Sequence, residues 1–266
     1  MKKLITYAAA LMLTGLSTSF AQNNTQQYLD NAIQTAENIP QDVQNASNAI
    51  DRLVYEVNIS GTPDAHAFYS SLFVLINHVQ NNADDIDYFM GLAENESTIP
   101  FSVAPVTALT AQLVVFNDDV IGLTYQIKDA VVENRYNDAN SLIPSLRNAL
   151  AAQSATSGDI ITLIEGIKQV TTIYTVEIHL VDSEGNPTST NDLNGYYTYN
   201  HATNQYIYPE DERDYSSNIF LLPAGTYTFD SFNGHWSGTN SNTVTLSNAF
   251  VNEDGVIIVE LILWSE

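Results

Sequence analysis

The five histidines are the residues whose chemistry is easiest to test from spacing. They are His66, His78, His179, His201 and His235. None lies in a His-Glu-x-x-His motif and no two stand four residues apart, so no pair shares a helical face as the ligands of a zinc hydrolase do. Gly-x-Ser-x-Gly nucleophile elbows and glycine-rich phosphate loops are also absent. The sequence therefore indicates no catalytic residues and no cofactor.

Carboxylates are abundant, with 31 Asp and Glu against eight Lys and Arg. Glycoside hydrolysis needs only two carboxylates that face each other across a cleft. In so acidic a chain such a pair can always be imagined, and no motif singles one out. A hydrolase that acts on an extracellular polymer through an unrecognised carboxylate pair stays open as an alternative.

Tyrosines form the most distinctive group of candidate binding residues. Period-two alternation places Tyr197 with Tyr199 on one face of a strand, and Tyr206 with Tyr208 on one face of its partner. If the two faces coincide, a ladder of rings forms that suits sugar stacking or a protein interface. The alternative is cross-strand packing that stiffens a hairpin. Trp236 is a fifth candidate binding residue, and Tyr196 and Tyr215 lie nearby in the sequence.

A second candidate group lies near the middle of the first half of the chain. Its members are His78, Asp118 and Asp119, with Gln153 at the expected level of the same layer. Bundle interiors hold metals and small ligands with side chains from facing helices, so these residues form a hypothetical metal or small-ligand site. The alternative is a polar layer that sets the helix register.

Helices must position this second group. Apolar residues recur in alternating steps of three and four from residue 25 to residue 170, which is typical of helices with a heptad stripe. The first two runs start at Leu29 and Ala65. The third run is Val106, Leu109, Leu113, Phe116, Val120, Leu123, Ile127 and Ala130, and the fourth includes Ala139, Leu142, Leu146, Ala149, Gln153, Thr156, Ile160, Leu163, Ile167 and Val170.

Short turn-rich joints separate the four runs, at residues 58–63, 95–100 and 134–137. Short joints place consecutive helices antiparallel, so the pattern predicts an up-down-up-down four-helix bundle over residues 22–171. Pro40 interrupts the first stripe without changing its phase, and we expect one kinked helix or two collinear ones there.

Strands must position the tyrosines. After Thr171 the period changes to two, and β-branched and aromatic residues alternate with turn signals. About seven strands are indicated, including a hairpin in which Tyr196–Tyr199 and Tyr206–Tyr208 flank residues 201–204. Seven short strands in residues 172–266 predict a β-sandwich.

The order of motifs in this second half resembles the carboxypeptidase regulatory-like family, over about residues 173–264. The motifs are Asp182-x-x-Gly185-Asn186-Pro187, Leu222-Pro223-Ala224-Gly225-Thr226-Tyr227, Gly234-His235-Trp236 and Thr243-Val244-Thr245-Leu246. The resemblance implies a transthyretin-like or Ig-like sandwich without catalytic activity. The chain departs from the family between Thr188 and Ser217, where the tyrosine-rich hairpin replaces a compact turn.

The N-terminus reads as a secretory signal. Lys2 and Lys3 precede an apolar run, and a small residue, Ala21, ends it, so residues 1–21 are expected to be cleaved. No later segment is expected to span a membrane. The chain has no cysteine, which removes disulfides and lipid attachment at a mature N-terminal Cys.

Charge narrows the class of partner. Loss of residues 1–21 removes two of the eight basic residues and no acidic one, so the formal charge goes from −23 to −25. A field of that sign repels phosphate backbones and anionic membranes, which argues against a nucleic-acid partner. Together these features predict a non-enzymatic exported bacterial protein, secreted, periplasmic or at the cell surface, that makes protein or glycan contacts at the cell envelope.

Export is directly testable. If residues 1–21 are the signal, mass spectrometry of the exported chain will find Gln22 as its first residue. A secreted chain that retains Met1 would contradict this assignment.

Overall fold

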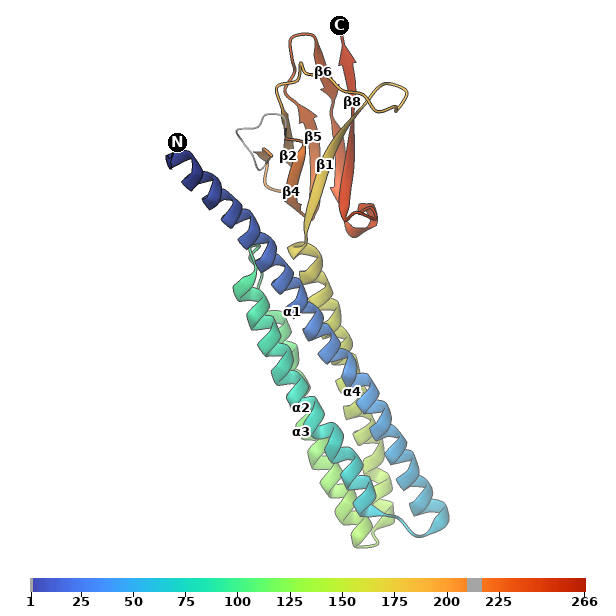
Figure 1. The fold of residues 1–266 in the computed structure, drawn as a ribbon. Coiled ribbons are helices and arrows are strands. Elements are labelled where there is room, and N and C mark those ends of the chain that lie inside the picture. Colours follow the sequence, from blue (N-terminus) through green and yellow to red (C-terminus); the bar gives the residue numbers. More distant parts are fainter. Residues whose placement is uncertain (1, 210–216) are drawn as a thin grey trace. The chain divides into compact units, whose positions relative to one another are not determined.

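The computed structural model describes residues 2–209 and 217–266, with the backbone alone for residues 2–23. The chain divides into two compact units, Met1–Lys168 and Gln169–Glu266. The first consists of helices and the second of strands (Figure 1). The predicted fold class, a helical bundle followed by a β-sandwich, is confirmed.

Four long helices make up the first unit in its described part. They are α1 (Lys2–Tyr55), α2 (Ala65–Glu96), α3 (Ala104–Val132) and α4 (Tyr136–Thr171), and a short π-helix, η1 (Glu56–Ser60), follows α1. Pro40 lies inside α1, which is assigned as one helix. The left-handed residues Gly61, at φ 68°, and Asn134, at φ 57°, stand in the first and third joints, where the chain reverses.

Polar contacts join each helix to its neighbours, and on α1 and α4 they show that the two helices are antiparallel. On α1 and α4, Asp51 pairs with Arg147 and Asp30 pairs with Lys168, so residue numbers rise along one helix as they fall along the other. The other neighbours are joined by His78 Nδ1 and Asp42 Oδ2 at 3.2 Å, by the Tyr69 and Tyr125 hydroxyls at 3.0 Å, and by Gln153 Nε2 and Asn117 Oδ1 at 3.2 Å.

The first apolar stripe lies in the core as predicted. Its members from Leu29 to Val57 are all buried, and they alternate in steps of three and four without interruption. Such a seam gives α1 a continuous face toward its neighbours. The members are Leu29, Ala32, Ala36, Ile39, Val43, Ala46, Ile50, Leu53 and Val57.

The predicted third stripe is wrong at three positions, while its last member, Ala130, is buried as predicted. Leu109, Phe116 and Leu123 are only partly buried and flank the core. The positions one residue later are buried instead, and polar residues hold them: Thr110, Asn117 and Thr124. The predicted and the observed stripe share Val106, Leu113, Val120 and Ile127. They differ only where the predicted stripe has apolar residues and the observed one has polar residues, so counting apolar residues selects the wrong stripe.

The fourth stripe needs the same correction. Leu163 is 38% exposed and Val170 is 54% exposed, whereas Leu150, Ser157 and Ile164 are buried. The second predicted run, which starts at Ala65, includes Asn82 and Phe89, and both are only partly buried, beside the buried Ala83 and Met90.

The expectation that no segment after residue 21 is apolar enough to span a membrane also needs a correction. In the part of the chain that the structure describes, α3 is long and apolar enough to cross a membrane by length and composition. A core helix of a bundle passes the same test. The buried residues Leu113, Val120 and Ile127 belong to the bundle core.

Two four-stranded sheets make up the second unit. Their strand orders are β4-β1-β8-β6 and β3-β2-β5-β7, and β1 and β8 are parallel while the other pairs are antiparallel. The strands are β1 (Ile173–Val181), β2 (Tyr196–Asn200), β3 (Gln205–Ile207), β4 (Ile219–Pro223), β5 (Gly225–Ser231), β6 (Ser237–Asn240), β7 (Asn242–Leu246) and β8 (Val256–Ser265).

The seven predicted strands are all present, and β6 is added to them. The β6 sequence, Ser-Gly-Thr-Asn, lacks the alternating β-branched and aromatic residues on which the prediction depended. Between the sheets lie alternate residues of each strand, and the Phe220 and Phe229 rings from opposite sheets meet edge to face at 5.8 Å. The same alternation turns the intervening side chains of β2 and β5 outward.

The corrected stripes yield a matched pair of mutations. Leu113→Ala is expected to lower the free energy of unfolding by about 2–5 kcal/mol, because it leaves a cavity in the core. Leu163→Ala removes the same atoms from an exposed site and is expected to cost only about 0.5 kcal/mol. Urea denaturation followed by far-ultraviolet circular dichroism measures both, and equal losses would show that the structure has the wrong stripe in the core.

Candidate functional site

The β2–β3 hairpin brings the predicted tyrosines together. Asn200 Oδ1 accepts hydrogen bonds from the backbone N–H groups of Ala202 and Thr203, at 2.8 and 3.1 Å, and Asn204 adopts a left-handed conformation at φ 55°. This turn fixes the strand register, so that Tyr199 lies directly opposite Tyr206. The tyrosine faces of the two strands therefore coincide.

Five rings form one continuous series on this outer face, which we call the tyrosine platform: Tyr197, Tyr199, Tyr206, Tyr208 and Phe232. The ring of Tyr206 lies 5.2 Å from that of Tyr199 and 5.7 Å from that of Tyr197, centroid to centroid. Phe232 continues the series, at 4.8 Å from Tyr197 and 6.1 Å from Tyr208. Tyr215 lies outside the described residues.

Exposure divides the platform into two layers. Tyr197 and Tyr199 are half-buried, which fits cross-strand packing. Tyr206, Tyr208 and Phe232 are 60%, 50% and 41% exposed. The platform thus combines a packed base with three rings that offer their surfaces to solvent.

A fixed carboxylate stands beside the rings. Asp230 Oδ2 accepts a hydrogen bond from the Tyr197 hydroxyl at 3.1 Å, and its Oδ1 accepts from Thr239 Oγ1 at 2.7 Å and from the Ser231 backbone N–H at 2.8 Å. Burial raises the pKa of Tyr197, and the negative charge of Asp230 raises it further. The hydroxyl therefore stays protonated and keeps donating to Asp230.

Rings and carboxylate together line a hollow of about 460 Å³. This volume lies within the range of small-ligand sites, roughly 300–1,000 Å³. Its described lining consists of Tyr197, Tyr206, Tyr208, Asp230, Ser231, Phe232 and Asn233.

Trp236 belongs to a neighbouring loop rather than to the platform. Among the described residues its ring contacts the His235 ring, edge to face at 4.5 Å, and none of the tyrosines. It is 61% exposed. Asp192 holds this loop, because its carboxylate accepts hydrogen bonds from the His235 and Trp236 backbone N–H groups, at 3.1 and 2.7 Å, and from Ser237 Oγ at 2.9 Å.

Phe232 lies at the start of the Trp236 loop and pairs with the segment that contains Asp192. Its backbone N–H donates to Gly195 O at 2.9 Å, and its carbonyl oxygen accepts from the Asn194 N–H at 3.0 Å. Glycine is required at position 234, because a Cβ there would lie 1.9 Å from Asp192 O. The contacts of Asp192 and Gly234 thus fix the loop that connects the platform with Trp236.

The hypothetical metal residues of the bundle do not converge. His78 pairs with Asp42, and Asp118 and Asp119 are exposed. Among the described residues, no group of three or more His, Cys, Asp or Glu side chains is placed to hold a metal ion.

Amides occupy the core at this level instead. Asn117 Nδ2 donates to Ile76 O at 3.0 Å, and Asn117 Oδ1 accepts from Gln153. Ser157 Oγ on α4 donates to Ala36 O on α1 at 2.7 Å. Gln153 Oε1 and Thr124 Oγ1 are buried and have no hydrogen-bond partner in the described part of the chain. The arrangement fits the alternative of a polar layer that sets the helix register.

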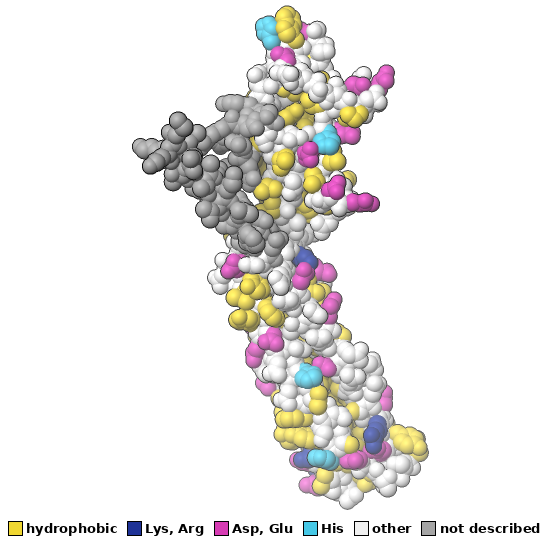
Figure 2. Space-filling model, in the orientation of Figure 1, with side chains coloured by type: hydrophobic (Ala, Val, Ile, Leu, Met, Phe, Trp, Pro, Cys, Tyr) yellow, Lys and Arg dark blue, Asp and Glu magenta, His cyan; other side chains and the backbone are white. Residues whose placement is uncertain are grey.

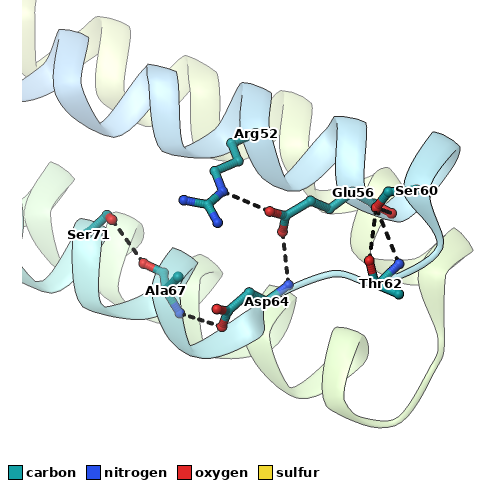
Figure 3. A network of polar contacts seen from close by, with 7 residues as sticks. All are labelled: Arg52, Glu56, Ser60, Thr62, Asp64, Ala67 and Ser71. Atoms are coloured by element: carbon teal, nitrogen blue, oxygen red, sulfur yellow. Dashed lines mark hydrogen bonds and ion pairs between the residues drawn. The ribbon is translucent and has the colours of Figure 1, made fainter.

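A second hollow, of about 250 Å³, lies near the joint between α1 and α2. Figure 3 shows its polar network: Glu56 accepts from Arg52 Nε at 2.7 Å and from the Asp64 backbone N–H at 2.9 Å, and Asp64 caps α2 by accepting from the Ala67 N–H at 2.8 Å. The Asp64 N–H and then Arg52 lower the pKa of Glu56. These groups are engaged in closing the joint, so this hollow is the weaker candidate for a ligand site.

Comparisons with known proteins add no functional argument. No family model and no curated protein matches the chain. A crystal structure of the S-layer protein rSbsC(31–844) is similar over 83% of this chain and 33% of its own, at 11% identity and a TM-score of 0.16. The chain thus spans about a third of that protein, and a score so low supports neither a shared fold nor a shared role. The resemblance to the carboxypeptidase regulatory-like family stays a prediction.

Sequence reasoning missed three members of this site: Phe232, Asp230 and Asp192. Period two along β5, continued past its end, points Asp230 and Phe232 to the same face as the tyrosines, so a signal for both was present. Asp192 gave no such signal, because its donors lie more than forty residues away in the chain.

The Asp192 contacts make a pH-dependent prediction. The backbone N–H groups of Trp236 and His235 lower the pKa of Asp192 below its ordinary value of 3.8. Their stabilising effect is therefore complete above pH 3.8 and is lost as the pH falls through the lowered pKa. In a Trp264→Phe, His235→Gln background, which leaves Trp236 as the single tryptophan and removes the imidazole that contacts its ring, Trp236 fluorescence should be constant down to pH 3.8 and change below it.

Asp192→Asn provides the control for this titration. The amide retains the size of the side chain but removes the charge, so the Trp236 signal should already differ at neutral pH and show no acid step. An identical titration in the variant would show that Asp192 does not hold the loop.

Proposed function

We propose that the chain is a non-enzymatic exported protein whose β-sheet unit binds a protein or glycan at the bacterial cell envelope. The observation that carries the proposal is the cluster of three exposed rings, Tyr206, Tyr208 and Phe232, around a hollow with a fixed carboxylate. Contiguous exposed apolar surface of this kind is typical of binding sites, and tyrosine is enriched at interfaces because it pairs an apolar ring with a polar hydroxyl.

The surface charge indicates which partners fit. Acidic side chains are spread over the visible face and basic ones are few (Figure 2), in line with the formal charge of −23. Such a surface disfavours nucleic acid and anionic membranes, and favours neutral or basic partners.

The helical unit supports this role as a spacer. Its core is a continuous set of heptad positions, and α2, with 32 residues, is about 48 Å long at 1.5 Å per residue. A bundle of this kind is stabilised by its own packing, and in the absence of cysteines that packing must suffice. We propose that it serves as a rigid body rather than a ligand site.

The lining of the hollow supports a binding rather than a catalytic role. A glycosidase needs two carboxylates, one of them free to act as an acid. The described lining contains one, Asp230, and hydrogen bonds from Tyr197, Ser231 and Thr239 hold it.

Truncation of the exposed rings tests the proposal. Tyr206→Ala and Tyr208→Ala should each weaken retention of the purified protein on intact cells of the producing strain by about thirtyfold, since a ring at an interface centre contributes about 2 kcal/mol. Both rings are largely exposed, so the free energy of unfolding should change by only about 0.5 kcal/mol.

Tyr88→Ala is the matched control, because Tyr88 is 62% exposed on α2 and lies outside the platform. It should leave both retention and stability unchanged. If retention is unaffected in both platform variants, or if Tyr88→Ala weakens it equally, the platform is not the contact surface.

A further inference from the structure

The hollow beside the platform has the properties of a site for a small polar ring. Its rings do not share one plane: Tyr208 and Phe232 are nearly parallel at 15°, while Tyr197 and Tyr206 meet at 65°. A saturated ring with C–H groups on its faces and hydroxyls on its rim suits an aromatic wall beside a polar one.

Asp230 supplies the polar wall. A carboxylate has about four acceptor positions. Among the described residues, Ser231 and Thr239 donate to Oδ1 and Tyr197 donates to Oδ2, which leaves an acceptor position on Oδ2. Because these donors fix the carboxylate in place, it can accept from a ligand hydroxyl without losing side-chain freedom.

The edge of the sheet argues against a peptide ligand that binds by adding a strand. A peptide that extends a sheet pairs with an exposed edge strand. The edge strand beside the platform, β3, has only three residues, Gln205–Ile207, and short edge strands disfavour such pairing.

Charge selects among glycans. The hollow contains a carboxylate, and the whole chain has a formal charge of −23. A uronic acid or another anionic sugar would be repelled both locally and at long range.

From these features we infer that the tyrosine platform binds a neutral glycan. A sugar ring packs against Tyr206, Tyr208 and Phe232, and one of its hydroxyls donates a hydrogen bond to Asp230. This inference rests on the proposed function and names the chemical class of its ligand. Asp230 is a binding residue in this account, and Tyr197 positions its carboxylate.

Competition with envelope polysaccharides tests the inference. Polysaccharide is released from the envelope of the producing strain, separated by anion exchange into neutral and acidic fractions, and added to full-length mature protein on intact cells. The neutral fraction should reduce retention at least tenfold, and the acidic fraction at equal sugar concentration should not. Addition of salt should leave the effect of the neutral fraction unchanged, since no charge pair is involved.

Variants connect the competition to the hollow. Asp230→Asn should weaken binding of the neutral fraction about tenfold or more, because an amide Nδ2 cannot accept a hydrogen bond from the ligand hydroxyl. Phe232→Ala tests the same site without removing any of the groups that donate to Asp230, and its melting temperature shows whether it folds. Tyr88→Ala should bind the neutral fraction like the wild type.

The outcomes separate this inference from the broader proposal. If protease treatment of the cells abolishes retention while neutral polysaccharide has no effect, and retention still depends on Tyr206 and Tyr208, the partner is a protein and the glycan inference is wrong. Competition by the acidic fraction alone would also overturn the glycan inference. Retention that is independent of Tyr206 and Tyr208 would overturn the proposed function itself.

Discussion

The pairing of Tyr199 with Tyr206 is the constraint on which the candidate site depends. Side chains alternate between the two faces of a strand, so a slip of one residue in the β2–β3 register would move the rings of one strand to the core face. Two features prevent the slip. The Asn200 side chain closes the turn, and β2 pairs on its other edge with β5, where the buried Thr198 lies opposite the buried Phe229. The core of the sandwich thus determines which surface is aromatic.

Buried amides have a comparable effect in the helical unit. Asn117 and Gln153 hydrogen-bond to each other, and Asn117 also reaches the Ile76 carbonyl. Sliding one helix by a turn would leave these amides buried without partners, at a cost of about 1–3 kcal/mol for each group. Apolar contacts alone tolerate such slips more easily, so the polar layer specifies register where the heptad stripe specifies only burial.

The local parts of the fold could be predicted from the sequence, and the non-local parts could not. Period and turn residues were sufficient for the four helices and for the tyrosine hairpin, because neighbours in the chain decide them. The phase of α3 was missed, since Leu109, Phe116 and Leu123 are more apolar than Thr110, Asn117 and Thr124. The distant partners Asp87 and Ile76 explain why Thr110 and Asn117 lie inside, and no described partner explains Thr124. Asp192 was missed for the same reason, because its role depends on backbone groups of a distant loop.

The central claim is that the tyrosine platform, rather than another exposed surface, meets the partner. Ile219, Leu221 and Trp264 on the other sheet are also partly exposed, and they provide an internal comparison. Hydroxyl-radical footprinting of the protein bound to intact cells, read by mass spectrometry, measures the oxidation rate of each side chain directly. We expect Tyr206, Tyr208 and Phe232 to be protected on binding while Tyr88 and Trp264 keep their free rates. Protection of Trp264 or the helices, with unchanged rates at the three platform rings, would contradict the account.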